Sequence, residues 1–372
     1  MNRLQFNGLE TRPSQVWGGV RLVPLVREEP IASLRLHHRA IDPDEPECCA
    51  DLYYMPHGLV AEWTDDGTAV PAVGTALQMP AATVRRSRNP PTKLERRTRV
   101  RFVPHQTSLE AYLPLSFRGP AIAWGEWSRL ALAHVLPRTD APRFTGEEIA
   151  GLQDALRVFE IHPGQCGVLV YVADALSGAF ITPHPDDYRA LHPTLVHDCY
   201  GELIWRYAFT YPETRDFTVH FDASAVDDLT GLRAQADRVR DEWRRFHDET
   251  MAAGLLGAEY AFTEAYRMAG HTLWRFRPRF ERGREAHVGE AIADADGRLA
   301  YLHSFRLSET QIRNGQLLQH LSEQDWNLER AAAAMGLVVP QLVARLDAAG
   351  YAALFRQNVV DRFRAMNVRY GR

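Results

Sequence analysis

The chain has few cysteines. Its 372 residues contain four, Cys48, Cys49, Cys166 and Cys199, and no two of them form a CxxC pair. A disulfide framework needs an even set of cysteines at regular spacings, so the sequence excludes a small disulfide-stabilised secreted fold. The pattern favours a reducing compartment.

Lysine and long apolar runs are also scarce. Lys93 is the single lysine among 43 basic residues, so a Schiff-base or lysine-base mechanism has only one residue to use. The apolar run from Gly167 to Ala173 is far shorter than the roughly 20 residues needed to cross a bilayer. The first ten residues form no apolar signal region. We therefore expect no membrane partner and a cytoplasmic location.

Charge of one sign is not in excess, because the net charge is −4. Binding to nucleic acid through the overall field of the protein is therefore excluded, and any such binding has to come from a local patch. The segment from Arg85 to Arg101 holds eight basic residues against the lone acid Glu95. A solvated loop that runs into a strand is the preferred interpretation, and a phosphate-facing loop is the alternative.

What the sequence does contain is a globular composition, with 45% apolar and 24% charged residues. Short β-branched runs predict strands at 20–26, 31–37, 99–103, 165–172 and 217–221, with a further strand that ends at Ile181. Helices are predicted at about 145–159 and 193–209. Four later runs, at 260–264, 272–280, 288–293 and 299–306, predict an antiparallel meander with a hairpin turn at Asp296-Gly297.

The longest predicted helix begins after Asp227 and Asp228 and ends at Gly254. Its apolar residues recur at alternating spacings of three and four, which makes a narrow seam. The seam consists of Leu229, Leu232, Ala236, Val239, Trp243 and Phe246. We expect this seam to pack on the sheet of its own body, and pairing with another helix in a dimer is the alternative.

A different helical pattern ends the chain. After a helix at 311–322, Asn327 can cap a second helix, Gly336 can end it in a left-handed turn, and a third helix follows to Gly350. These residues resemble the Fis-type helix-turn-helix, whose asparagine, alanine pair, glycine, leucine and basic-leucine pair match in register. The matching positions are Asn327, Ala331, Ala332, Gly336, Leu342, Arg345 and Leu346. The predicted fold class is therefore α+β, with a mixed β-rich body of several packing helices at 1–306 and an all-α helix-turn-helix unit with a C-terminal helix at 307–372; a subdivision of the body near residue 140 stays open.

The role of this unit depends on the start of its third helix. Only Gln341 and Arg345 could read DNA bases there, whereas Val339 and Val343 are expected to be exposed and to form a surface that docks on protein. The net charge of residues 311–372 is +3, which is modest for phosphate contact. Docking is the preferred interpretation, and DNA binding is the alternative.

Residues near His184 are the candidates for ligand binding. We expect four residues of the protein to contact a ligand: Gln165, His184, Asp186 and Asp187. The His-Pro-Asp-Asp order is also typical of a turn and helix cap. Further histidines and a cysteine follow, but their spacings fit no zinc motif, and no metal is expected. No GxSxG, Walker A or GxGxxG pattern is present, so the catalytic residues, if any, stay unknown.

Two stretches of the body are similar to the ARPP domains, which are bacterial proteins associated with ADP-ribosylglycohydrolases and rhodanese-like phosphatases. The first runs from Leu9 through Trp17-Gly18-Gly19 to Leu25, and the second from Gly164 to Tyr171 with a later helix that ends at Leu203–Ala208. The central motif of that family is a Cys-Glu pair that leads into Arg-Trp. Its nearest counterpart in this sequence is Gly125-Glu126-Trp127. The resemblance implies an accessory or ligand-handling role in NAD or ADP-ribose metabolism, and it supplies no catalytic residues.

Three functions compete at this point. The first is an accessory or ligand-sensing protein of an NAD- or ADP-ribose-linked bacterial system that binds a nucleotide-type small molecule and docks through its C-terminal unit. The second is a one-component DNA-binding transcription regulator. The third is an unrecognised hydrolase or transferase that uses the His184 region. The sequence leaves the cofactor and the oligomeric state open.

Overall fold

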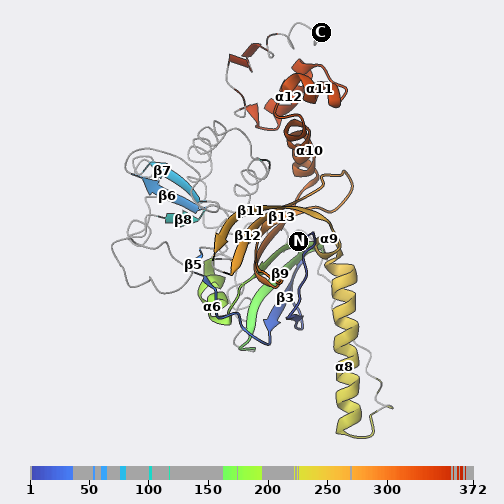
Figure 1. The fold of residues 1–372 in the computed structure, drawn as a ribbon. Helices are drawn as coiled ribbons and strands as arrows, with labels where there is room; N and C mark the ends of the chain where they lie inside the picture. Colours follow the sequence, from blue (N-terminus) through green and yellow to red (C-terminus); the bar gives the residue numbers. More distant parts are fainter. Residues whose placement is uncertain are drawn as a thin grey trace.

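The computed structural model describes residues 2–36, 53–54, 60–64, 76–80, 100–102, 117, 162–173, 175–194, 222, 224, 226–268, 270–352, 355, 358–359, 361–362 and 365. Its centre is a nine-stranded antiparallel sheet with the order β1-β3-β9-β10-β14-β13-β12-β11, and β2 also pairs with β3 (Figure 1). The chain is therefore a mixed α+β protein built on a large antiparallel sheet.

The inner strands of the sheet are buried on both faces. These strands are β3 (Val20–Arg27), β9 (Gln165–Val172), β10 (Ala175–Ile181), β13 (His287–Asp294) and β14 (Leu299–Arg306). Almost every residue in them is shielded from solvent, as expected for the continuous apolar runs in the sequence. The predicted strands at 20–26 and 165–172 and the predicted meander are confirmed.

The outer strands are shorter or more polar. At one edge lie β1 (Leu9–Thr11) and β2 (Gln15–Trp17), and at the other lie β11 (Tyr260–Met268) and β12 (His271–Pro278). Two small sheets are separate from the large one: β4 (Arg35–Leu36) pairs with β5 (Tyr53–Tyr54), and β6 (Val60–Thr64) lies between β7 (Ala76–Pro80) and β8 (Val100–Phe102). The strand predicted at 31–37 is reduced to β4, while β8 confirms the one at 99–103.

Helix α6 (Pro185–Thr194) follows β10 directly. His184 and Pro185 open this helix, as the helix-cap interpretation of His-Pro-Asp-Asp expects, and most of the helix predicted at about 193–209 lies outside the described residues. The predicted helix at 145–159, the predicted strand at 217–221, most of the Arg85–Arg101 segment and the proposed counterpart at Gly125–Trp127 lie outside the described residues.

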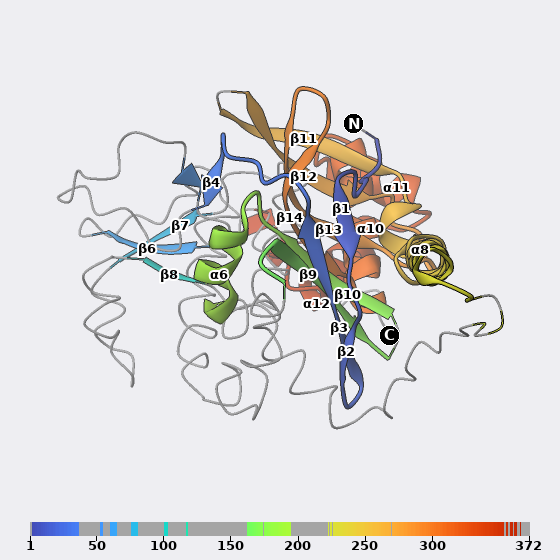
Figure 2. The same cartoon turned by 90° about the horizontal axis from the view of Figure 1, so that it is seen from below.

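The long helix α8 (Leu229–Phe246) begins where predicted, with Asp228 as its cap: Asp228 Oδ1 accepts a hydrogen bond from Gly231 N at 2.6 Å. It continues through a π-helical turn, η7 (His247–Met251), into α9 (Ala253–Leu256). Gly254 lies inside α9, so the predicted end of the helix is wrong. Figure 1 shows α8 extending away from the sheet, and Figure 2 shows it nearly end-on beside β1.

The expected packing of the α8 seam on the sheet is also wrong. None of the 18 residues of α8 is buried, and Leu229 is 72% exposed, Leu232 42% and Phe246 43%. Among the described residues, the base of the seam approaches the body, where Trp243 packs beside a core that contains Leu255 and Tyr260.

The C-terminal helices are α10 (Glu309–Glu323), α11 (Leu328–Ala334) and α12 (Val339–Ala348), at the residues where three helices were predicted. Helices α11 and α12 meet at an angle of 95°, and Gly336, with φ +65°, lies in the turn between them. Their buried residues, such as Leu318, Ala332 and Leu342, form one core with Phe280 and Phe305 of the body.

Helix α10 fastens this unit to the body. Gln316 Nε2 donates a hydrogen bond to the carbonyl of Phe280 at 3.0 Å, and Phe280 N donates to Gln319 Oε1 at 3.4 Å. A Cβ at Gly315 would lie 2.2 Å from the Phe280 ring, so only glycine allows this close approach.

No single helix among the described residues is long and apolar enough to cross a membrane. The pair α11 and α12 meets the length and composition criteria only when taken together, across its 95° bend.

Candidate functional site

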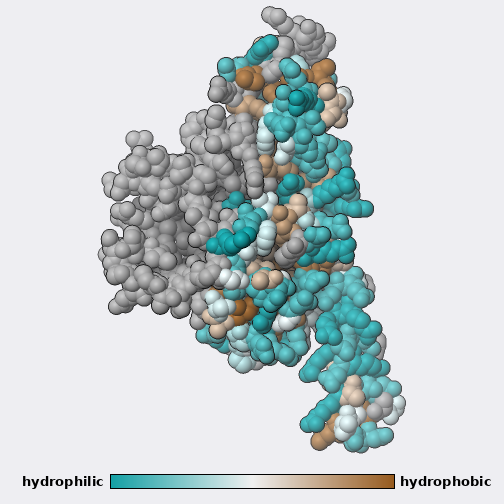
Figure 3. Space-filling model, viewed as in Figure 1, coloured by the Kyte–Doolittle hydropathy of each residue, from teal (hydrophilic) through white to brown (hydrophobic). Residues whose placement is uncertain are grey.

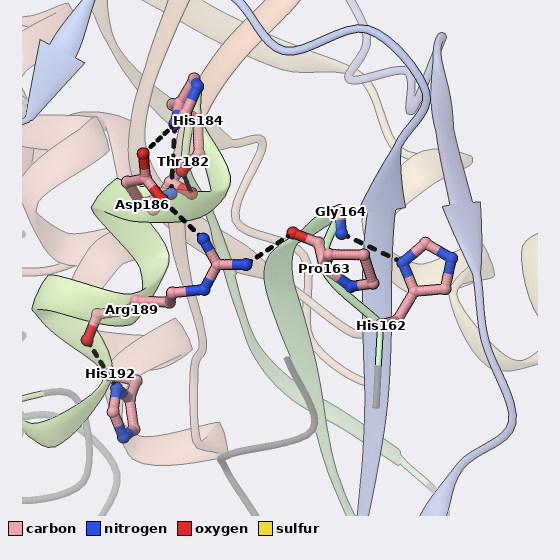
Figure 4. A network of polar contacts seen from close by, with 8 residues as sticks. All are labelled: His162, Pro163, Gly164, Thr182, His184, Asp186, Arg189 and His192. Atoms are coloured by element: carbon pink, nitrogen blue, oxygen red, sulfur yellow. Dashed lines mark hydrogen bonds and ion pairs between the residues drawn. The ribbon is translucent and has the colours of Figure 1, made fainter. Parts of the chain in front are cut away.

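The residues singled out near His184 meet at one corner of the sheet, which we call the α6 corner (His162–Gly164, Thr182, His184, Asp186, Arg189 and His192; Figure 4). Gly164 precedes β9, and Thr182 follows β10, so the antiparallel pairing of these strands brings the two segments together. The Thr182 hydroxyl lies 2.8 Å from the carbonyl oxygen of Cys166. This hydrogen bond fixes the chain where it leaves the sheet to enter α6.

His184 and Asp186 serve the start of α6. His184 Nδ1 accepts a hydrogen bond from Asp186 N at 3.1 Å, so the imidazole caps the helix in the way a Ser or Asp side chain would. Asp186 Oδ1 pairs with Arg189 Nη1 at 2.5 Å, and Arg189 Nη2 donates to the carbonyl of Pro163 at 2.9 Å (Figure 4). The contacts of Asp186 and Arg189 therefore hold the helix against the loop before β9. They support the helix-cap interpretation of His-Pro-Asp-Asp.

The other two predicted ligand residues are buried. Asp187 is shielded in the first turn of α6, and Gln165 on β9 is 1% exposed. Gln165 Nε2 donates to the carbonyl of Gly167 at 3.3 Å, but Gln165 Oε1 accepts no hydrogen bond within the described part of the chain. Because buried acceptors are rarely left unpaired, the Gln165 side chain has a hydrogen-bonding capacity that the described residues do not fill.

His192 completes the corner through contacts within α6. Its Nδ1 lies 2.9 Å from the carbonyl of Arg189, and its ring stacks on Tyr188 with centroids 6.3 Å apart. Across the described ranges, no group of three or more His, Cys, Asp or Glu side chains could hold a metal ion. His197 and Cys199, which belong to the same histidine-rich stretch, lie outside them.

A buried arginine that sequence reasoning missed lies on the opposite face of the sheet from Gln165. Arg27, 2% exposed, donates from Nε to the carbonyl of Thr182 at 3.1 Å and from Nη2 to those of Leu299 and Ala300. Burial lowers the pKa of this guanidinium, and burial beside it raises the pKa of the Cys166 thiol to about 12. The thiol is therefore neutral, and Arg27 joins three strand ends through backbone carbonyls.

A second missed group joins the sheet to the base of α8. The Tyr171 hydroxyl lies 2.6 Å from His247 Nε2, and His247 Nδ1 lies 2.8 Å from Asp248 Oδ1. Tyr171 and His247 are fully buried, and burial, with the nearby carboxylates, raises the pKa of Tyr171. Since the tyrosine and the histidine are 76 positions apart, no spacing in the sequence could have revealed this contact.

A cavity of about 820 Å³ lies between α8 and the edge of the sheet. It is lined by Glu10–Ser14 on one side and by Asp237, Val239, Arg240, Asp241, Trp243 and Arg244 on the other. Every arginine in the lining already faces an acid: Arg12 with Glu10 at 3.1 Å, Arg240 with Asp237 at 3.2 Å and Arg244 with Asp241 at 2.9 Å. The charges balance, so the lining offers no preference for an anion, and Val239 and Trp243 provide its apolar part.

The residues of α12 that were predicted to bind DNA or to dock on protein are only partly at the surface. Val343 is 3% exposed and belongs to the core of the unit, so the expectation that it is exposed is wrong; Val339 is half-buried. Both face inward because residues 339, 342, 343 and 346 lie on one side of the helix. Val338, Gln341 and Arg345 are exposed, and Gln341 Oε1 accepts a hydrogen bond from Val338 N at 3.4 Å.

The charge of the helical unit is negative. Residues 309–352 contain three arginines and five acidic residues, a net charge of −2, and the positive charge of the C-terminal region comes from residues 353–372. The surface of α10 to α12 therefore has no excess of cations for phosphate contact.

Comparison with known proteins gives one match. No curated protein and no solved structure matches the chain. The ARPP-2 family matches residues 4–269. This segment contains the strands of the large sheet up to β11, together with the α6 corner and α8, and it ends before α10 to α12. Because this match covers more than half of the sequence, the chain belongs to the ARPP-2 family.

Proposed function

We propose that the protein is an accessory, ligand-sensing member of an NAD- or ADP-ribose-linked bacterial system. Its ARPP-2 body would bind a nucleotide-type ligand, and its C-terminal helices would dock on protein. Membership of the ARPP-2 family supports the first part, since the resemblance to ARPP domains implies an association with ADP-ribosylglycohydrolases.

The observation that carries the ligand site is Gln165 Oε1. It is a buried acceptor without a donor in the described structure, beneath a corner where His184 and Asp186 are partly exposed. A buried carbonyl oxygen left unpaired costs about 1–3 kcal/mol, and an amino or hydroxyl group of a nucleotide could supply the missing hydrogen bond. Catalysis at the same corner has less support, since His184 and Asp186 already serve as cap and tie.

Thermal denaturation with NAD, ADP-ribose and related nucleotides tests the site. A ligand at a hundred times its dissociation constant stabilises a protein by about 2.7 kcal/mol. We expect such stabilisation in the native protein and its loss in the Gln165→Leu variant. Gln341→Leu, the same change at an exposed position far from the corner, should keep it. A native protein that no nucleotide stabilises would contradict the proposal.

Docking by the C-terminal unit is supported by its charge and by the bonding of Gln341. The unit carries a net charge of −2, and Gln341 is engaged with its own helix start rather than free to meet a base. The exposed apolar residue Val338, with the half-buried Val339 beside it, offers a contact surface for protein.

DNA binding remains the second candidate because of the geometry of α11 and α12. Two helices at 95°, joined by a short turn that contains Gly336, have the shape of a helix-turn-helix. Fluorescence anisotropy of labelled genomic fragments over a salt series separates the two functions. We expect no site-selective binding; selective binding that is lost in Gln341→Ala and Arg345→Ala but kept in Val339→Ser would establish DNA recognition instead.

A further inference from the structure

The projecting helix α8 has the residue pattern of a helix that pairs with another helix. Its apolar positions follow each other at three and four residues, and its opposite face carries ion pairs between neighbouring turns. A helix of 18 residues is about 27 Å long and depends on tertiary packing of its apolar face for most of its stability. Here that face is exposed along the outer half of the helix.

The space beside the seam is open as well. At its base, Val239 and Trp243 line the cavity of about 820 Å³ that separates α8 from Glu10–Ser14. Farther out, α8 projects beyond the body, and Figure 3 shows a mostly hydrophilic rod with hydrophobic surface at its far end. The exposed Leu229 and Leu232 belong to the first turn of α8. The described part of the body therefore leaves the outer half of the seam uncovered.

Charges on the two sides of the seam indicate what does cover it. In heptad notation, position a is occupied by Leu229, Ala236 and Trp243. Position g is then occupied by Asp228, Gln235 and Glu242. Position e is occupied by Arg233 and Arg240, and by His247, which is buried at the helix end. One flank is thus acidic or neutral and the other is basic.

This asymmetry favours a second copy in parallel orientation. In a parallel pair, g positions face e positions of the other helix, so Asp228 lies near Arg233 of the second copy and Gln235 near Arg240. In an antiparallel pair, e faces e and g faces g, which would place Arg233 beside Arg240 and Asp228 beside Glu242. Like charges at such contacts destabilise the pair.

We propose that α8 is a dimerisation helix, through which two copies of this chain associate by a parallel pairing of their Leu229–Phe246 seams. The six apolar residues span about two and a half heptads, which is short for a coiled coil, so the dimer dissociates on dilution. Leu229, the most exposed of the six, and Leu232 form the distal pair of the seam, which extends farthest from the body.

Sedimentation equilibrium on the full-length protein tests the dimer. We expect a concentration-dependent monomer–dimer equilibrium in the native chain. Leu232→Asp should weaken it about a hundredfold or more, because two buried leucines are replaced by two facing carboxylates. Ala234→Asp is the matched control: it adds the same charge two residues away on the outer face and should leave the dimer intact. Circular dichroism confirms that both variants stay folded, as their exposed positions predict.

A Leu232→Cys variant tests the orientation. In a parallel pair the two introduced thiols face each other and form an intermolecular disulfide under mild oxidation, whereas in an antiparallel pair position 232 faces the region of Trp243. The native chain, oxidised in the same way, measures any cross-linking by its own cysteines. A native protein that stays monomeric at high micromolar concentration, or a dimer that Leu232→Asp leaves unchanged, would overturn the proposal; a dimer in which Leu232→Cys adds no cross-linking would overturn the parallel arrangement.

Discussion

Helix α8 and the helices α10 to α12 carry similar apolar spacings but have opposite surroundings. The six apolar residues of the α8 seam include none that is buried, whereas in α10 to α12 residues such as Leu318, Leu342 and Leu346 are almost completely shielded. The difference shows that periodicity defines a helix and its apolar face but does not determine what covers that face.

The reason lies in how each segment joins the sheet. Helix α10 follows β14 after two residues, and the glycine at 315 lets it lie directly on Phe280, so its neighbours close around a shared core. In the described part of the chain, helix α8 meets the body at its C-terminal end, through η7 and α9, and its first turns extend away from the sheet (Figure 1). The different burial of α8 and of α10 to α12 therefore follows from where each segment joins the sheet, and not from its hydrophobicity.

The largest expected effect compares one leucine from each region. Leu342→Ala should destabilise the protein by about 2–5 kcal/mol, because it leaves a cavity in a filled core. Leu232→Ala, measured at a dilution where the chain is monomeric, should change stability by no more than about 0.5 kcal/mol. Urea denaturation of both variants is the measurement. Equal losses would mean that α8 is packed as tightly as α12 in solution.

A smaller effect is expected from filling space within the C-terminal unit. Ala332 is buried in α11, so Ala332→Leu should overpack the core and cost about 1–3 kcal/mol. Ala333→Leu adds the same atoms on the exposed face of the same helix and should cost almost nothing. Hydrogen exchange in α10 to α12 reports the change locally. Unchanged protection in Ala332→Leu would show that α11 is not tightly packed at this position.

The junction between the body and the C-terminal unit should respond to pH. His287 is fully buried between Ala286 and Val288, both in the shared core, and its Nε2 lies 2.8 Å from Glu285 Oε1. Burial lowers the pKa of His287, with a further decrease from Arg306, and Glu285 opposes it only in part.

The sign of this effect follows from which state binds the proton. The folded protein resists protonation of His287, whereas the unfolded chain takes up a proton below about pH 6.5. Stability is therefore highest above that pH and falls as the pH drops toward the folded-state pKa, by at most about 1.4 kcal/mol per pH unit. Denaturation midpoints between pH 7.5 and about pH 5 should fall less steeply in His287→Gln; an identical slope would assign the loss to another group.

The smallest expected effect has the opposite sign. Val338 is the N-cap residue of α12, and its side chain cannot accept a hydrogen bond from the helix start. Val338→Ser adds that acceptor at an exposed position and should stabilise the unit by about 0.5–1 kcal/mol. Thermal denaturation with Val338→Ala as the control isolates the cap; a serine variant no more stable than the alanine variant would show that the Gln341 contact already suffices.

The sequence by itself determined much of the local structure. The apolar runs at 20–26 and 165–172, the meander around Asp296-Gly297, the cap at Asp228 and the turn at Gly336 all occur as predicted, because each depends on residues close together in the chain. The start of α6 depends on nearby residues too, because the His184 imidazole caps it, although a histidine cap is a less common helix signal than Ser, Thr, Asp or Asn.

Only the tertiary structure decided which side chains are buried and which lie together. It placed Val343 in a core and left Leu229 exposed, buried Arg27 beneath three strand ends, and brought Tyr171 to His247. Each of these outcomes depends on contacts between segments far apart in the sequence. Side-chain periodicity fixes the face on which a residue lies, but only the packing of distant segments determines whether that face meets protein, ligand or water.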